Sequence, residues 1–167
     1  MHNSSLNVLM RLFLSNLLFV LLSNSSLISQ TNRYLSLELG GSGGLYSFNI
    51  EKSVLKTKPK HFQWHYGCSV LPSSGRINFV LPIGVSYLIG KQQHMAEFGI
   101  GQGLAIVWDY TWHWVHTFPR ATGMIAYRWN SSDQKYFFRL AYTPLISYIV
   151  DFQYQHWFGV TAAVKLK

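Results

Sequence analysis

Two charged residues interrupt predicted strand faces that otherwise carry small side chains, and they are the first candidates for chemistry. Glu97 shares its face with Gly99 and Gly101, and Arg139 shares its face with Ala141 and Thr143. A charge that points into a protein interior is costly unless an opposite charge pairs with it. We therefore expect Glu97 and Arg139 to form an ion pair in the interior. The pair could belong to a proton or ion path, but we expect it to have the structural role of filling the interior.

A metal site is a weaker hypothesis. His113 and His116 have the H-x-x-H spacing found in some metal sites, within Trp112-His113-Trp114-Val115-His116. No cysteine or carboxylate cluster accompanies them, and only Asp109 is near. Tryptophans in a loop at a membrane interface would explain this segment equally well. We predict no metal ion and no cofactor.

Catalysis by a nucleophile also lacks a signature. Histidines and serines that could serve as base and nucleophile are scattered, namely His65, Ser69, Ser86 and His156. A nucleophilic site needs its nucleophile and base within hydrogen-bond reach, which this spacing does not specify. We therefore expect no catalytic activity. An enzyme that modifies acyl chains of lipid A or phospholipid remains the alternative from another functional class.

Basic residues dominate the charge of the chain. The sequence has 14 Lys and Arg against 6 Asp and Glu, with a pI near 9.7. The densest basic cluster consists of Lys52, Lys56, Lys58 and Lys60. Basic side chains can bridge the phosphates of lipopolysaccharide, so this cluster is a candidate contact for that lipid, although a solvated loop is the simpler interpretation. Nucleic-acid binding is not expected beside an export signal and apolar strand faces.

Composition limits the class of protein. The chain has 167 residues, of which 49% are hydrophobic, 16% aromatic and 12% charged. Disordered chains have few aromatic and many charged residues, so disorder is excluded. So few charges can hardly coat a water-facing surface. A single cysteine excludes an internal disulfide framework.

The first thirty residues predict an export signal. Arg11 provides a positive start, Leu12–Leu22 is apolar, and Ser23–Gln30 is polar. The apolar run is too short to cross a bilayer as a helix and fits the centre of a signal peptide. We assign residues 1–30 to the signal and residues 31–167 to one mature domain.

The mature chain alternates in period two, which is typical of strands. In Ile77–Ile89, each odd position is large and apolar, whereas the even positions are small or mixed. Four further segments behave alike, namely Phe62–Val70, Met95–Trp108, Lys135–Thr143 and Trp157–Leu166. One face is bulky and apolar, and the other is rich in Gly, Ala, Ser and Thr.

This pattern predicts an inverted barrel. Large apolar side chains would face lipid, and small or polar side chains would fill a narrow lumen. The barrel must be closed because every backbone group needs a partner in hydrocarbon. The fold class is therefore all-β, a closed up-and-down antiparallel transmembrane β-barrel of about eight strands. Rings near strand ends suit the bilayer interface, namely Tyr34, Trp64, Tyr87, Trp108, Trp112, Trp114, Trp129, Tyr136, Tyr148 and Trp157.

The sequence leaves two ways to count the strands. If Gly40–Gly44 is a turn, Tyr34–Glu51 forms two strands, and Lys91–Gln93 and Asn130–Gln134 are short periplasmic turns. Asp109–Thr117 and Pro144–Gln155 are then external loops, and Glu51–Lys60 is a periplasmic one. Otherwise Tyr34–Glu51 is one bent strand, and the eighth strand lies within Leu145–Gln155.

Three stretches together resemble a known family. They are Leu37–Glu51, Phe79–Gly101 and Tyr136–Ile146, which are similar to small outer-membrane β-barrel proteins of the kind abundant in Bacteroidota. The resemblance implies an eight-stranded barrel without assigned catalytic residues. We therefore expect a structural or membrane-associated protein of the cell outer membrane. The expected partners are outer-membrane lipid, lipopolysaccharide and, during biogenesis, the barrel-assembly machinery, and the protein is expected to be a monomer. A periplasmic carrier of lipocalin type, with its apolar face inward, is the other alternative.

Overall fold

The computed structural model describes residues 32–57, 60–91, 93–110, 114–147 and 152–166. The predicted signal, residues 1–30, lies outside these residues. Residues 32–167 form one compact unit. Among the described residues, no helix is long and apolar enough to span a membrane.

Antiparallel strands make up the described chain. Their bounds are β1 Arg33–Gly40, β2 Tyr46–Thr57, β3 Lys60–Ser73, β4 Arg76–Lys91, β5 His94–Asp109, β6 Trp114–Asn130, β7 Tyr136–Tyr142, β8 Leu145–Ser147, β9 Gln153–Gln155 and β10 Phe158–Leu166. The order β5-β4-β3-β2-β1-β10-β7-β6 closes because β5 also pairs with β6. These eight strands form a closed barrel, and β8 and β9 form a side hairpin on β6. The predicted fold class is confirmed.

The first of the two strand counts is correct. Gly40 ends β1, the 3-10 turn η2 (Gly41–Gly43) follows, and β2 begins at Tyr46. The count that placed the eighth strand within Leu145–Gln155 is wrong, because that segment contains the short hairpin β8–β9. Glu51–Lys60 is also not a loop. β2 continues through Glu51 to Thr57, and β3 begins at Lys60.

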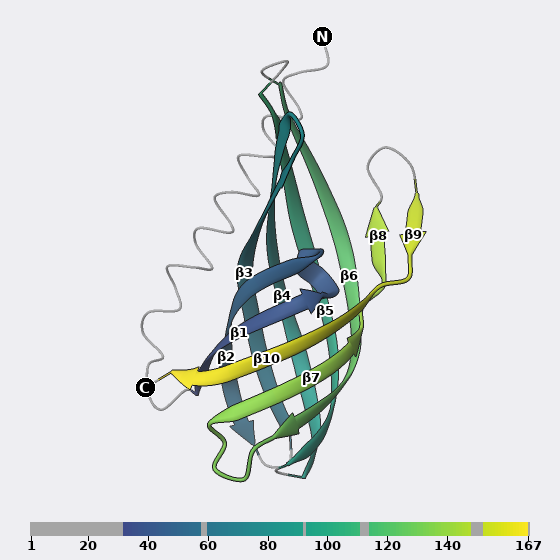
Figure 1. The fold of residues 1–167 in the computed structure, drawn as a ribbon. Coiled ribbons are helices and arrows are strands. Elements are labelled where there is room, and N and C mark those ends of the chain that lie inside the picture. The colour runs from purple at the N-terminus through teal and green to yellow at the C-terminus, as the bar shows by residue number, and fades with distance from the viewer. Residues whose placement is uncertain (1–31, 58–59, 92, 111–113, 148–151, 167) are drawn as a thin grey trace. The chain divides into compact units, whose positions relative to one another are not determined.

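The barrel wall is uneven in height. β3, β4, β5 and β6 have 14, 16, 16 and 17 residues, whereas β1, β7 and β10 have 8, 7 and 9. We call the end where β1 begins and β10 ends the lower end, and the opposite end the upper end. Figure 1 shows the long strands rising past the others at the upper end. This four-stranded extension is called the upper sheet. Trp114–Thr117, expected to lie in a loop, is the start of β6.

Side chains alternate between the lumen and the outer surface as the sequence predicts. On β7, Phe137, Arg139 and Ala141 are buried, and Phe138 and Leu140 are exposed. The outer surface is formed by exposed apolar side chains around the barrel, including Leu37, Phe48, Phe79, Phe98, Ile125, Phe138, Leu140 and Val160. The inverted arrangement is therefore present: the apolar face points outward, and small and polar residues point inward.

One of the aromatic residues expected at a membrane interface lies inside instead. Tyr34 is 5% exposed and packs edge-on against Phe137, with ring centroids 5.3 Å apart. The reason is its register, since Leu35, Leu37 and Leu39 take the outer face of β1 and leave Tyr34 to the lumen. Outward-facing rings do form contacts near the lower end, as Trp129 with Phe138 and Phe62 with Tyr87.

Candidate functional site in the barrel lumen

Five charged side chains from five strands meet inside the barrel. They are Glu38 on β1, Glu51 on β2, Glu97 on β5, Arg128 on β6 and Arg139 on β7. The sequence contains three glutamates, and all of them belong to this group. No member is more than 4% exposed. We call these five residues the lumen cluster.

Arg139 on β7 contacts side chains from strands that do not pair with β7. Its Nη1 lies 3.1 Å from Glu97 Oε1, and its Nη2 lies 3.0 Å from Glu51 Oε1. Nη2 also donates a hydrogen bond to Thr161 Oγ1 on β10, over 3.2 Å. The two residues proposed as an interior pair, Glu97 and Arg139, are thus brought into contact. The contact belongs to a larger group rather than to an isolated pair.

Arg128 makes the second set of contacts. Its Nη1 lies 3.5 Å from Glu51 Oε2 and 3.9 Å from Glu97 Oε2, and it donates to Gln63 Oε1 over 2.7 Å. Its guanidinium also lies 3.5 Å from the centroid of the Phe137 ring. A planar guanidinium can use its edge for carboxylates and its face for an aromatic ring, which a lysine ammonium cannot do equally.

Hydroxyl groups complete the partners of the carboxylates. Ser86 Oγ donates to Glu97 Oε1 over 2.7 Å, and Ser36 Oγ donates to Glu51 Oε1 over 3.3 Å. Glu38 Oε2 accepts from Ser42 Oγ and Ser47 Oγ at 3.3 and 3.2 Å. Buried ions persist when they are both paired and hydrogen-bonded, and each of the three carboxylates has an arginine partner and at least one hydrogen-bonded oxygen. Within the described residues, Glu97 Oε2 and Arg139 Nε have no hydrogen-bond partner. Its charges bind one another across the lumen, so the cluster fills the barrel centre.

Sequence reasoning missed three members of the cluster. Glu38 alternates with Leu37 and Leu39, and Glu51 shares a face with Asn49. Arg128 lies between the outward Tyr127 and Trp129. The period-two pattern that identified Glu97 and Arg139 would also have identified these three, had it been applied to β1, β2 and β6.

The residues considered for a nucleophilic site do not assemble into one. His65 and Ser69 face the lumen, and within the described chain neither His65 Nδ1 nor Ser69 Oγ has a hydrogen-bond partner. Ser86 is bonded to Glu97, as described above. His156 lies on the outside, where its Nδ1 is 2.7 Å from the Tyr142 hydroxyl. The structure therefore brings none of these serines to a histidine base.

The metal hypothesis gains nothing from the geometry. His113 lies outside the described residues. His116 is exposed on β6, and its ring is 6.1 Å from those of both Trp114 and Phe118. Within the described residues, no group of three or more His, Cys, Asp or Glu is placed to hold a metal ion.

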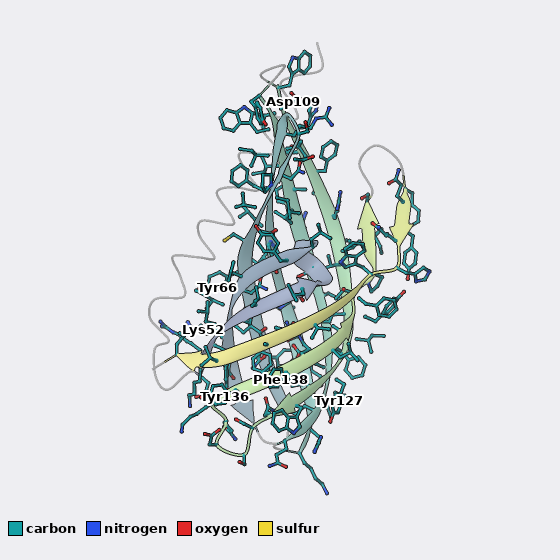
Figure 2. The ribbon with its side chains drawn as sticks, in the orientation of Figure 1. Lys52, Tyr66, Asp109, Tyr127, Tyr136 and Phe138 are labelled. Atoms are coloured by element: carbon teal, nitrogen blue, oxygen red, sulfur yellow. The ribbon has the colours of Figure 1, made fainter. Side chains whose placement is uncertain are left out.

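The lysines of the proposed lipopolysaccharide contact lie near the lower end. Lys52 pairs with Trp64 and Arg33, Lys56 pairs with His61, and Lys60 pairs with Thr57. Lys58 lies outside the described residues. Figure 2 labels Lys52 near the lower end of the barrel and Asp109 at the tip of the upper sheet.

A shallow cavity lies at that tip. It has a volume of about 310 Å³ and is lined by Arg76, Asp109, Trp114 and His116. Arg76 Nε lies 2.9 Å from Asp109 Oδ2, and the arginine side chain is 60% exposed whereas that of the aspartate is 10% exposed. This ion pair ties β4 to β5 where the two strands have reached the end of the upper sheet.

Comparison with known proteins finds likeness to solved structures. No family model matches the chain, and no curated protein matches it. A solved structure that resembles it is that of Ail, the attachment invasion locus protein of Yersinia pestis. The two share 9% sequence identity with a TM-score of 0.48, and the match covers 81% of this chain and 95% of that one.

Proposed function

We propose that this chain is an integral outer-membrane protein whose barrel spans the bilayer as a plugged, non-conducting cylinder. The observation that carries the proposal is the inverted distribution of side chains. Leucine and phenylalanine cover the outside of the barrel, as at Leu140, which is 61% exposed, while the five charges of the lumen cluster are buried inside. A water-soluble barrel would have the reverse arrangement. Lipid offers no hydrogen-bond partner to backbone N–H and C=O groups. In a closed barrel each strand is paired on both sides, so these groups bond to one another.

The proposal assigns a side to each end of the barrel. Bacterial outer-membrane barrels have short periplasmic turns and longer external segments. The lower end has the short connection between β6 and β7, and the upper end carries the upper sheet and the hairpin β8–β9. We therefore assign the lower end to the periplasm. The upper sheet would then stand outside the membrane, where it can be displayed to the surroundings of the cell.

Lipid contacts follow from this assignment. Outer-membrane lipid would cover the band of exposed apolar side chains around the barrel, which we call the apolar belt. Lipopolysaccharide would lie along the upper edge of this belt. Of the four lysines predicted to contact lipopolysaccharide, the described ones, Lys52, Lys56 and Lys60, lie near the lower end, so they would reach that lipid only if the barrel were inserted the other way round. The barrel-assembly machinery remains the expected partner during insertion, and the protein is proposed to act as a monomer.

Two alternative functions find less support. A lipid carrier of lipocalin type needs an apolar interior, whereas this interior holds a network of charged and hydroxyl side chains. An enzyme that modifies acyl chains needs a nucleophile hydrogen-bonded to its base. Ser69 and Ser86 have no such contact with a histidine in the described chain.

Cysteine labelling in intact cells tests both the location and the orientation. Ser74 and Ser132 are exposed turn residues at the upper and lower ends. Each is replaced by cysteine in a Cys68→Ser background and treated with a membrane-impermeant maleimide. We expect labelling of Ser74→Cys in intact cells, and labelling of Ser132→Cys only after the outer membrane is opened. Equal labelling of both, or recovery of the protein in the soluble periplasmic fraction, would contradict the proposal.

A further inference from the structure

The turn between β1 and β2 folds inward across the upper mouth of the barrel. Gly41 and Gly43 are buried, although turns at strand ends usually point to solvent. Gly43 faces Pro82 on β4, and a Cβ added at Gly159 on β10 would come within 2.9 Å of the Gly41 backbone. On β5, a Cβ added at Gly103 would lie 3.4 Å from the Ser42 carbonyl oxygen. The turn therefore lies close to β4, β5 and β10 of the barrel wall.

Glycine makes this inward course possible. Gly40, Gly41 and Gly44 have φ values of 73°, 77° and 92°, which side chains other than glycine rarely adopt. Two backbone hydrogen bonds lie within the turn: Gly40 N–H donates to the Leu45 carbonyl oxygen over 2.8 Å, and Gly44 N–H donates to the Gly41 carbonyl oxygen over 3.4 Å. Such a short glycine-rich turn has little stability of its own, so its position depends on what holds it.

Glu38 is the side chain that holds the turn. Its Oε2 accepts hydrogen bonds from Ser42 Oγ within the turn and from Ser47 Oγ just after it. Its other oxygen, Oε1, lies 3.9 Å from Arg139 Nη2. Glu38 therefore links the turn to the lumen cluster, and it is itself only 2% exposed.

The charges of the cluster do not balance. Three carboxylates face two guanidinium groups, so one negative charge is in excess when all three are ionised. Glu51 and Glu97 each have a close contact with Arg139, at 3.0 and 3.1 Å, whereas Glu38 has only the 3.9 Å contact. Glu38 is thus the carboxylate with the weakest compensation. Protonation of Glu38 therefore sacrifices less ion-pair attraction than protonation of Glu51 or Glu97.

Charged or polar side chains from six other strands share the lumen with Glu38. They are Glu51 on β2, His65 on β3, Glu97 on β5, Arg128 on β6, Arg139 on β7 and Thr161 on β10. Among them His65 carries the imidazole, the side chain whose ordinary pKa lies nearest to neutral pH. His65 does not contact the turn through any hydrogen bond, whereas Glu38 accepts two from it or beside it.

We propose that Glu38 is a proton-operated latch on the upper mouth: as a carboxylate it holds the β1–β2 turn across the mouth, and when protonated it releases the turn and admits water to the upper lumen. Protonation weakens the attraction to Arg139. Oε1 faces the guanidinium of Arg139, so the proton is expected on Oε2. There it turns an acceptor into a donor, so Ser42 and Ser47 can no longer both donate to Oε2 as they do here. The lumen cluster below still closes the barrel, so the latch controls access to the upper lumen alone.

Amide hydrogen exchange in the folded barrel tests the latch. Exchange of residues 40–45 is compared at about pH 7 and about pH 4.5, with correction for the intrinsic pH dependence of exchange. We expect the protection of the turn to fall at least about tenfold at the lower pH. Amides of the β1–β10 ladder, such as Leu37 and Val160, should stay protected at both. Equal protection of the turn at the two pH values would overturn the proposal.

Two variants separate Glu38 from His65. Glu38→Gln should show the acid-state exchange of the turn already at about pH 7 and should lose the pH response. His65→Gln should keep the response of the wild type. The proposal fails if Glu38→Gln still responds to pH, or if His65→Gln abolishes the response.

A third variant tests the latch without changing Glu38, so the test does not depend on the folding of Glu38→Gln. Ser42→Ala removes one partner of the latch and leaves the carboxyl in place, and it should speed exchange of the turn at about pH 7.

Access of water to the upper lumen is measured separately, at a fixed, mildly alkaline pH, with a thiol reagent. The probe is Ser69→Cys in a Cys68→Ser background, because Ser69 is buried and faces the lumen. Glu38→Gln should accelerate its labelling about tenfold, and unchanged labelling in a folded variant would contradict opening of the mouth.

Discussion

Glu97 on β5 and Arg139 on β7 meet inside the barrel at 3.1 Å, although 42 residues separate them in the chain. β6 lies between these two strands in the wall, so the contact bridges β5 and β7 across the inner side of β6. It also places the two residues in a group with unequal numbers of positive and negative charges. This inequality makes the consequences of removing each partner different.

Loss of Arg139 should destabilise the barrel more than loss of Glu97. Arg139→Gln leaves three carboxylates with one guanidinium, and uncompensated buried charge of this kind costs about 3–5 kcal/mol. Glu97→Gln leaves two carboxylates with two guanidinium groups, so we expect a cost of about 1.5–3 kcal/mol, from the weakened bonds with Arg139 and Ser86. Urea unfolding in detergent micelles or lipid vesicles measures both values.

The exposed side chain of Lys91, at the end of β4, gives the control for these two variants. Lys91→Gln also removes one charge, but from the surface, and its free energy of unfolding should stay close to that of the wild type. If Glu97→Gln also leaves unfolding unchanged, the pair contributes nothing measurable. If Glu97→Gln proves more damaging than Arg139→Gln, the inequality of charge is not what governs this cluster.

The faces of the strands could be predicted from the sequence because period two follows from backbone geometry alone. Leu140 and Arg139 needed only their neighbours to be assigned to the outside and the inside. The partners of Arg139 were harder to predict, because they depend on which strands meet across the lumen. That in turn depended on whether Gly40–Gly44 was a turn. The inward course of this turn rests on Pro82, Gly103 and Gly159, which lie far along the chain.

Local propensity misled the assignment of Tyr34. A tyrosine near a strand end fits a membrane interface, but its face of β1 is set by the leucines that follow it. The same reasoning explains the lysine-rich stretch after Glu51. Its composition favours a solvated loop, whereas pairing with β3 extends β2 through it to Thr57. In both cases the register of a whole strand outweighed the preference of single residues.

Gly159 and Gly103 offer a matched pair for the packing of the β1–β2 turn. Gly159→Ala would place a methyl group 2.9 Å from Gly41 backbone atoms, which cannot rotate away. We expect it to displace the turn and to cost about 1–3 kcal/mol. Gly103→Ala would meet the Ser42 carbonyl oxygen at 3.4 Å, so it should be tolerated with a change within about 0.5 kcal/mol. Thermal unfolding followed by gel mobility compares them, and equal losses would show that the close approach at Gly159 does not matter.

The turn between β6 and β7 should resist acid through Asp133. Hydrogen bonds from the Ser131 hydroxyl and then from the Lys135 backbone N–H lower the pKa of the Asp133 carboxyl to about 2. Because the pKa is lowered in the folded state, this carboxylate stabilises the turn above its ordinary pKa of about 3.9, and the contribution is lost as the pH falls through about 2. Ser131→Ala should raise the pKa toward its ordinary value. Carboxyl carbon shifts in an NMR titration measure both, and an unshifted pKa in the wild type would contradict the contacts.

Arginine substitutions on the outer face should show whether that face contacts lipid or water. Leu140 on β7 and Val115 on β6 are equally exposed, at 61% and 63%, but Leu140 lies within the apolar belt and Val115 lies near the tip of the upper sheet. In a bilayer, Leu140→Arg should cost about 2–4 kcal/mol, because the charge must be placed in hydrocarbon. Val115→Arg should cost little, because it lies beyond the belt. Urea unfolding of each variant in phospholipid vesicles gives the two values. If both substitutions are equally harmless, the outer face is bathed in water, and the barrel does not span the membrane as proposed.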